Sequence, residues 1–259
     1  RKKTKRKTSG DYWTNRALKR EKEAYLTGNE LNKKMFEFYE NASNDIRKQI
    51  NDFYSRYASE NGLTFDEAMI ELNKSEYREW KKSLDEYVME YETEADPIRA
   101  AELKARVDAR AYRSRITRLE AVSTQIEGAV NGLYFGAVTA MSKDFAKVFE
   151  KSFMGKAEDL AERFDIDMGF TQKYFSEKMV KDVISYPWCG NHFSDRLWKN
   201  KENLIFNLRD ILSRGLQSGT GLPQMAKEMA DKTGQSFKAA YNLVESETTH
   251  FHEEANFRA

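Results

Sequence analysis

Between Asn29 and Glu60, apolar residues recur along the chain at steps of three and four. This spacing places them on one face of an α-helix. Gly62 follows the pattern, and glycine is typical of the position just after a helix. The sequence therefore predicts a helix over residues 29–60, whose apolar face consists of Leu31, Met35, Phe38, Ala42, Ile46, Ile50, Phe53 and Tyr57.

The middle of the chain predicts further helices, one of them unusually long. A capping-box pattern at 64–67 predicts a short helix, and helical spacing returns between Tyr77 and Tyr91. Asp96-Pro97 is typical of a helix start, because Asp accepts hydrogen bonds from the first turn and Pro fits the first helical position. No proline follows until after Phe153, and a continuous helix of that span would be roughly 85 Å long. We therefore expect an elongated all-α protein with one very long helix.

Shorter helices are predicted beyond Phe153. Helical patterns at 157–164 and 172–184 are separated by a turn at 165–169, and the aromatic and turn residues at 186–190 break the series. Ser194 is the predicted N-cap of the next helix, which ends at 219–221.

The last two predicted helices are divided at Gly234. One covers 222–230, and the other is capped by Ser236 and runs through Phe251. Their spacing is that of a helix-turn-helix, whose second helix enters the major groove of DNA. That second helix has a net charge of −1 between Ser236 and Glu247, and phosphates would repel it. A DNA-reading module is therefore the weaker alternative for this region.

Charge is distributed unevenly along the chain. The 43 basic and 42 acidic residues give a net charge of +1, yet residues 1–22 carry +8 and residues 23–259 carry −7. We divide the chain into a basic N-terminal arm (1–22), an elongated helical region (23–185) and a smaller C-terminal helical module (186–259). A cationic segment without apolar residues binds polyanions through counterion release. A polyanion such as DNA and an acidic partner protein are equal candidates for contact with Arg1, Lys2, Lys3, Lys5, Arg6 and Lys7.

Composition excludes several classes of protein. Hydrophobic residues make up 40% and aromatic residues 13% of the chain, enough for a packed core. The 13 Gly and 3 Pro leave few turns, which disfavours a large β-sheet. The longest uncharged window, between Glu127 and Lys143, is shorter than the roughly 20 apolar residues of a membrane-spanning helix. The single Cys189 is typical of a reducing compartment.

Three glycines at steps of four lie inside the predicted long helix. Each costs about 1 kcal/mol relative to alanine, so a close approach must offset the loss. Packing within the chain is the first explanation, and docking of another protein's helix is the second. The candidate docking stripe is Gly128, Gly132 and Gly136.

Catalytic constellations are weak in this sequence. Glu247, His250 and Glu254 share a helix face and offer three metal ligands, but the facing helices supply no second Glu-x-x-His unit. The Glu245-Ser246-Glu247 triplet has the form found in ADP-ribosyltransferases without the surrounding sheet. Cys189 and His192 lack an evident third group. We therefore expect no enzymatic activity, no metal and no cofactor.

The segment from Trp188 to Arg258 resembles the phage minor head protein family, the Mu F-like head morphogenesis proteins. The resemblance rests on the run from Gly190 to Trp198, on the turn and helix from Gly215 to Ala226, and on a final helix with Ser246-Glu247-Thr248-Thr249. The sequence departs at His250, where many relatives carry arginine, and at Ser246, where threonine is frequent. The family-motif residues are Gly190, Phe193, Ser194, Arg196, Trp198, Glu247 and Thr248.

This resemblance implies a non-enzymatic minor capsid protein of a tailed phage. Such a protein binds the portal inside the procapsid and assists head assembly, DNA packaging or DNA delivery. The implied partners are the portal protein, with major capsid or scaffold protein as further candidates, and double-stranded DNA through the basic arm. The implied location is the virion interior near the portal vertex, and the host cytoplasm during assembly, with no membrane contact in the head.

Overall fold

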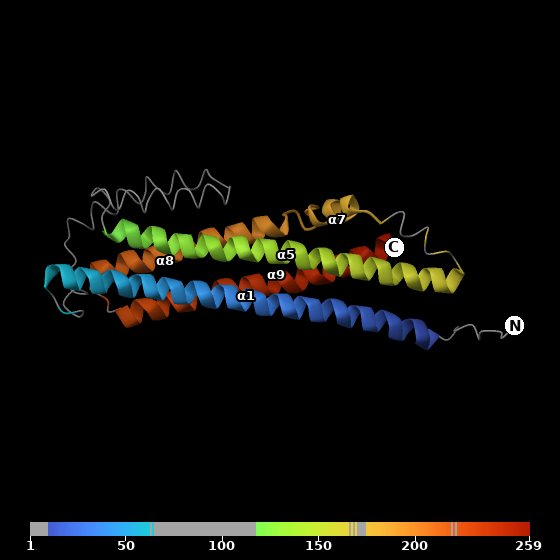
Figure 1. Cartoon of the computed structure of the whole chain (residues 1–259), viewed down its shortest axis with the longest axis horizontal. Helices are drawn as coiled ribbons and strands as arrows, with labels where there is room; N and C mark the ends of the chain where they lie inside the picture. Colours follow the sequence, from blue (N-terminus) through green and yellow to red (C-terminus); the bar gives the residue numbers. More distant parts are fainter. Residues whose placement is uncertain are drawn as a thin grey trace. The chain divides into compact units, whose positions relative to one another are not determined.

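The protein is all-α in every part that the computed structural model describes, namely residues 10–62, 64, 118–165, 167, 169, 175–218, 220 and 222–259. Two of the helices are very long: α1 (Gly10–Asn61) has 52 residues and α5 (Arg118–Phe164) has 47. Three more follow along the chain: α7 (Glu177–Ile184), α8 (Phe193–Ser218) and α9 (Leu222–Arg258). Figure 1 shows them in the colours of the sequence. The fold class predicted from the sequence is confirmed.

Helix α1 contains the predicted helix and begins much earlier. Its buried face includes Leu31, Met35, Ala42, Ile46, Ile50 and Phe53, as the spacing predicted. Tyr39 is buried where the pattern gave Phe38, which is only half-buried. The helix starts at Gly10, so residues 10–22 of the predicted arm are helical. The sequence missed this start because apolar residues are sparse there, and ion pairs hold the segment in place.

Helix α5 covers the second part of the predicted long helix. It continues past Phe153 without the expected interruption and ends at Phe164. Asp165 then adopts a positive φ of 59°, which turns the chain where a turn was predicted. The expected helix start at Asp96-Pro97, the capping box at 64–67 and the helix between Tyr77 and Tyr91 lie outside the described residues, apart from Thr64.

The predicted helix-turn-helix is wrong, because α9 is one helix of 37 residues. It passes through Gly234, and Thr233 Oγ1 donates to the carbonyl of Met229 one turn earlier. Ser236 does not cap a new helix. Its hydroxyl is buried and hydrogen-bonded to Tyr134 and Asn200. Ser236 therefore forms buried hydrogen bonds within unit 2. The helix continues although one exposed glycine, Gly234, lowers its stability relative to alanine.

Contacts group the chain into two compact units. Unit 1 comprises 1–35, 138–196 and 240–259, and unit 2 comprises 36–137 and 197–239. Each unit is assembled from segments far apart in sequence, and both sides of the expected boundary at 185/186 belong to unit 1. Helices α1, α5, α8 and α9 each contribute to both units.

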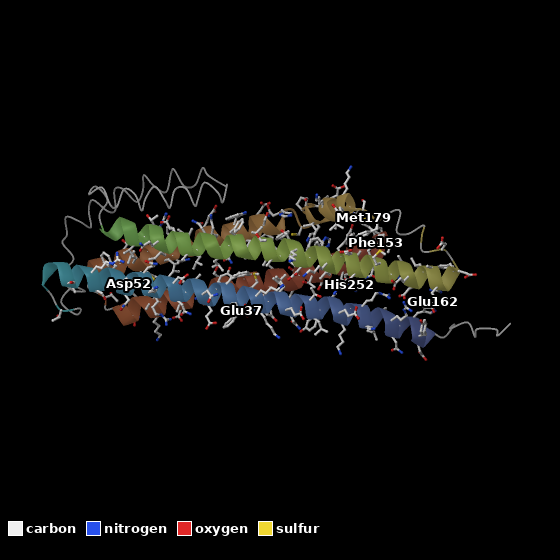
Figure 2. The ribbon with its side chains drawn as sticks, viewed as in Figure 1. Glu37, Asp52, Phe153, Glu162, Met179 and His252 are labelled. Carbon is white, nitrogen blue, oxygen red and sulfur yellow. The ribbon has the colours of Figure 1, made fainter. Side chains whose placement is uncertain are left out.

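Each unit has an aromatic core. In unit 1, Phe145 lies 5.3 Å from Phe193 and 5.1 Å from Phe251 between ring centroids. Phe153, labelled in Figure 2, packs on Phe149 and Phe175. In unit 2, Tyr39 contacts the rings of Tyr134 and Phe237.

Among the described residues, no helix combines the length and the apolar character that a membrane-spanning segment needs.

Candidate functional site

Two side chains from the start of the resembling segment reach one buried carboxylate in unit 1. Glu247 of α9 is 1% exposed. Arg196 Nη1, from the first turns of α8, donates to Glu247 Oε1 at 3.0 Å, and Trp188 Nε1, from the preceding turn, donates to Oε2 at 3.0 Å. Both carboxylate oxygens are thus engaged by groups more than fifty positions earlier in the sequence. We call Trp188, Arg196, Glu247 and His250 the Glu247 cluster.

The Trp188 ring also stacks on His250, one turn after Glu247. The ring centroids are 4.3 Å apart and the planes are inclined by 13°. Burial lowers the pKa of His250, although Glu247, Glu254 and Glu253 act to raise it. The imidazole is therefore held towards its neutral form, which stacks on the indole without desolvating a cation. A histidine at this position is suited to the tryptophan beside it.

The conformation of the loop before α8 positions Trp188 and Arg196. Gly190 has φ of +90°, a conformation that side chains rarely adopt. His192 then fastens the loop: its Nε2 lies 2.7 Å from the carbonyl of Ile184 and its Nδ1 lies 2.6 Å from Ser194 Oγ. Gly190 and His192 therefore shape a tight connection between α7 and α8.

Helix α8 begins two residues earlier than predicted. Its first residue is Phe193, and the carbonyl of His192 accepts hydrogen bonds from the amides of Asp195 and Arg196. The side chain of Asp195 accepts from the amide of His192 at 3.2 Å. The prediction of Ser194 as the N-cap is wrong because Ser194 lies inside the first turn, where it contacts the His192 ring. Phe193 is 2% exposed and anchors the turn to Phe145.

Two other motif residues lie apart from the Glu247 cluster. Trp198 belongs to unit 2, where Lys201 Nζ lies 4.4 Å from its ring centroid. Thr248 is 5% exposed, and its Oγ1 has no hydrogen-bond partner within the described structure. A Cβ atom on Gly28 of α1 would lie 3.0 Å from that oxygen. Helices α1 and α9 of unit 1 thus approach closely at Gly28 and Thr248.

Among the described residues, the other groups weighed from the sequence have structural neighbours of their own. Glu247 is held by Arg196 and Trp188, and Glu254 pairs with Arg258 at 2.6 Å. No group of three potential metal ligands is found among the described residues. Glu245-Ser246-Glu247 lies on helix α9. Cys189 is exposed, and Arg196 Nη1 lies 3.6 Å from its sulfur.

The glycine stripe and the basic arm stay predictions. A Cβ on Gly136 would lie 3.2 Å from the ring of Phe38 in unit 2, so a side chain of the same chain fills that space. Gly132 has open space around it, and Gly128 is half-buried. Arg1, Lys2, Lys3, Lys5, Arg6 and Lys7 lie outside the described residues.

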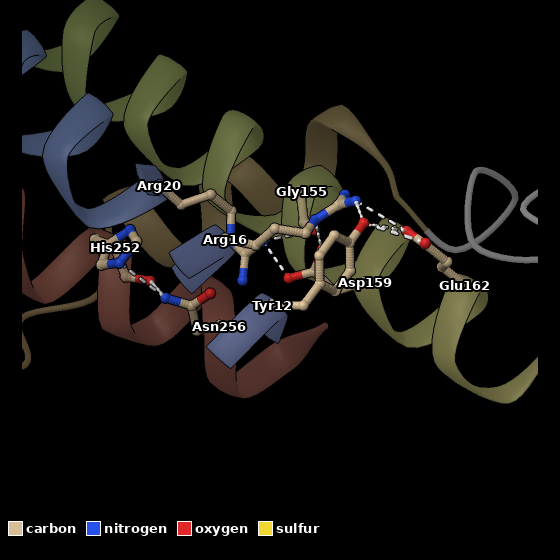
Figure 3. A network of polar contacts seen from close by, with 8 residues as sticks. All are labelled: Tyr12, Arg16, Arg20, Gly155, Asp159, Glu162, His252 and Asn256. Atoms are coloured by element: carbon tan, nitrogen blue, oxygen red, sulfur yellow. Dashed lines mark hydrogen bonds and ion pairs between the residues drawn. The ribbon is translucent and has the colours of Figure 1, made fainter. Parts of the chain in front are cut away.

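One polar network in unit 1 was not predicted from the sequence. Arg16 and Arg20 of α1 both form ion pairs with Asp159 of α5, and Arg16 Nη1 also reaches Glu162 at 2.9 Å (Figure 3). Arg20 Nη1 donates to the carbonyl of Gly155 at 3.3 Å. The network fixes the start of α1 on the end of α5, both within unit 1. The only signal in the sequence is a pair of arginines four residues apart.

Comparison with protein-family models, with curated proteins and with solved structures finds no match for this chain.

Proposed function

We propose that this chain is a minor capsid protein of a tailed phage, which binds the portal inside the procapsid and assists head assembly, DNA packaging or DNA delivery. Its further partners would be the major capsid or scaffold protein, and its place the virion interior near the portal vertex. We assign it no catalytic step. It would act by docking helical surfaces onto other proteins.

The observation that carries the proposal is the pairing of Arg196 with Glu247. These residues belong to two of the three sequence segments that resemble minor head proteins, and they lie 51 positions apart. A common family fold would bring such residues together, and here Arg196 donates to a carboxylate that is 1% exposed. Trp188, at the edge of the resembling segment, completes the same contact.

Exposed aromatic side chains support a binding role. In unit 1, Phe257 is 87% exposed, Tyr186 64% and Phe164 62%. Contact of apolar surface with water is unfavourable. Large exposed aromatic residues are therefore typical of sites that another protein covers. In unit 2, Phe206 is 72% exposed. Each unit thus offers at least one aromatic anchor for a partner.

The composition of phage particles tests the proposal. Purified procapsids and virions are digested and analysed by mass spectrometry, with the portal and the major capsid protein as internal standards. We expect peptides of this chain in the procapsids, at far fewer copies than the major capsid protein. Absence of the chain from both kinds of particle, when the portal is detected, would end the proposal.

Contact of the basic arm with DNA is a second candidate function, favoured by six cations among the first seven residues. Its test uses a deletion of residues 1–9, because α1 begins at Gly10 and a longer deletion would remove Arg16 and Arg20. The deletion should weaken DNA binding and flatten its dependence on salt. An unchanged salt dependence would reject contact between the arm and DNA.

A further inference from the structure

His252 lies where three helices of unit 1 meet. It is a half-buried side chain near the end of α9, and its Nδ1 lies 2.7 Å from the hydroxyl of Ser152 on α5. Arg20 of α1 is close enough to act on its charge, and Figure 3 shows the ring beside the start of α1. Ser152 is 3% exposed, so the hydrogen bond lies at the edge of the core. The imidazole therefore ties the last turns of α9 to α5.

Asn256, one turn later on α9, determines which ring nitrogen of His252 carries the proton. Its Nδ2 lies 3.1 Å from His252 Nε2 and donates to the backbone carbonyl of His252 at 2.9 Å. An amide nitrogen only donates, and the opposite orientation of the amide would bring two carbonyl oxygens together. Nε2 is therefore an acceptor. The neutral ring carries its proton on Nδ1 and donates it to Ser152.

A second proton on the His252 ring is incompatible with this arrangement. It would bind at Nε2 and face the N–H groups of Asn256, so one hydrogen bond would be lost and a cation would lie in a half-buried site. Solvation of the new N–H requires the ring to turn towards water. That movement withdraws Nδ1 from Ser152 and leaves a buried hydroxyl without its partner.

The charged groups around His252 do not compensate for this loss. Burial lowers the pKa of His252 and Arg20 of α1 lowers it further, whereas Glu21 of α1 and Glu253 of α9 act to raise it. Asp159 of α5 holds Arg20 in an ion pair, which keeps the guanidinium near the ring. Both glutamates are exposed, where water and salt weaken their attraction for a cation.

We propose that His252 is a pH switch, whose neutral ring holds the end of α9 on α5 and whose protonation releases residues 252–258. Release would uncover Phe251 and Ala255, which are 1% and 0% exposed. The switch consists of residues of unit 1 and needs no partner. Its test is therefore separate from that of the proposed capsid function.

The state of the ring is tested first, by NMR of the full chain with isotope-labelled histidine. The signals of His252 are those that disappear in His252→Gln. At pH 7.5 we expect the tautomer that is protonated at Nδ1, because Asn256 donates to Nε2. The tautomer protonated at Nε2 would overturn the proposal.

Asn256→Asp should reverse the effect of acid. A carboxylate in place of the amide accepts a hydrogen bond from protonated Nε2, so the pKa of His252 should rise instead of being lowered. Asn242→Asp adds the same charge at an exposed position of α9 in unit 1, ten residues away, and should leave the titration of His252 nearly unchanged. Equal shifts in the two variants would overturn the role of Asn256.

Hydrogen exchange measures the release itself. Between pH 7.5 and pH 5, exchange at 252–258, corrected for intrinsic rates, should increase about tenfold in the parent chain and at most about twofold in His252→Gln. Asn256→Asp should also stay within about twofold, because its carboxylate retains the protonated ring. This second variant decides the matter if His252→Gln loses helix content by circular dichroism. An increase in Asn256→Asp as large as that in the parent chain would overturn the proposal.

Discussion

The two units hold their helices together with different polar chemistry. Within the described residues, unit 1 buries the carboxylates of Asp144, Asp159 and Glu247, and unit 2 buries that of Glu127. Each carboxylate of unit 1 meets at least one cation, such as Lys34 at 2.5 Å and Lys147 at 2.8 Å from Asp144. Unit 1 therefore relies on charge at the contacts between its helices.

Unit 2 relies mainly on neutral hydrogen bonds. Tyr134 OH lies 3.1 Å from Tyr39 OH and 2.6 Å from Ser236 Oγ, and Ser236 donates to Asn200 Oδ1 at 3.0 Å. Burial raises the pKa of Tyr134 and of Tyr39, so these hydroxyls keep their protons at physiological pH. We therefore expect salt and pH to change the stability of unit 1 more than that of unit 2.

The largest expected effect follows from removing a carboxylate of unit 1. Asp159→Ala should lower the free energy of unfolding by about 3 kcal/mol, because it leaves Arg20 without its ion partner in a mostly buried position. Urea unfolding of the full chain measures this. Glu158→Ala, at the exposed neighbouring position, should stay within about 0.5 kcal/mol of the parent chain. Equal losses of stability at both positions would contradict the claim that ion pairs hold the helices of unit 1 together.

A smaller effect is expected in unit 2. Tyr134→Phe should cost about 1–2 kcal/mol, because it leaves Ser236 and Tyr39 with one hydrogen bond fewer in the core. The cost should be the same at low and high salt, unlike that of Asp159→Ala. Tyr186→Phe, at a side chain that is 64% exposed, is the control and should change little. A strong salt dependence for Tyr134→Phe would contradict the comparison.

Thr248→Val should raise the stability of the chain by about 1 kcal/mol, since the hydroxyl that it removes is buried without a partner. Thermal unfolding followed by circular dichroism measures the gain. Thr249→Val, at the exposed neighbour, should show none. A loss of stability in Thr248→Val would mean that the hydroxyl is satisfied in solution.

Acidification should loosen unit 1 first. Burial lowers the pKa of His250 and of His252, so the unfolded chain binds more protons and stability falls as the pH drops below about 6.5. Asp144 adds to the loss at lower pH: burial opposes its ionisation, but Lys147 and Lys34 prevail and lower its pKa. Stability from Asp144 is therefore present above its unfolded pKa and lost as the pH falls further.

Glu127 in unit 2 should respond with the opposite sign. Burial raises its pKa even though Arg209 lies 2.6 Å away, so protonation costs the folded state less than the unfolded state. Its contribution improves as the pH falls through this raised pKa. Hydrogen exchange between pH 7 and pH 4, corrected for intrinsic rates, should show protection lost at 240–259 before 222–239. The reverse order would contradict the comparison.

The apolar face of α1 could be predicted from the sequence because helical spacing is local. The positions from Leu31 to Phe53 identify that face without knowledge of any partner helix. The division of α9 at Gly234 was predicted wrongly for a related reason: glycine and Ser236 resemble a turn and a cap when only neighbours are considered. The buried contacts of Ser236 with Tyr134 and Asn200 outweigh that local preference.

Contacts between helices lay beyond the sequence pattern. Arg20 and Asp159 are each one of several charged residues on their helices, and their pairing depends on which faces of α1 and α5 meet. The resemblance names Glu247 and Arg196 as motif residues and begins at Trp188. Their mutual hydrogen bonds follow only from the fold. The close approach of Gly28 and Thr248 likewise requires two helices from opposite ends of the chain.

Binding of the purified full chain to the portal protein encoded by the same genome tests the central claim most directly. Surface-bound portal rings are titrated with the chain, and the major capsid protein serves as the control ligand. We predict saturable binding to the portal that Phe257→Ala weakens, because this exposed aromatic side chain would lose its contact. No binding of a chain that is folded by circular dichroism would contradict the account.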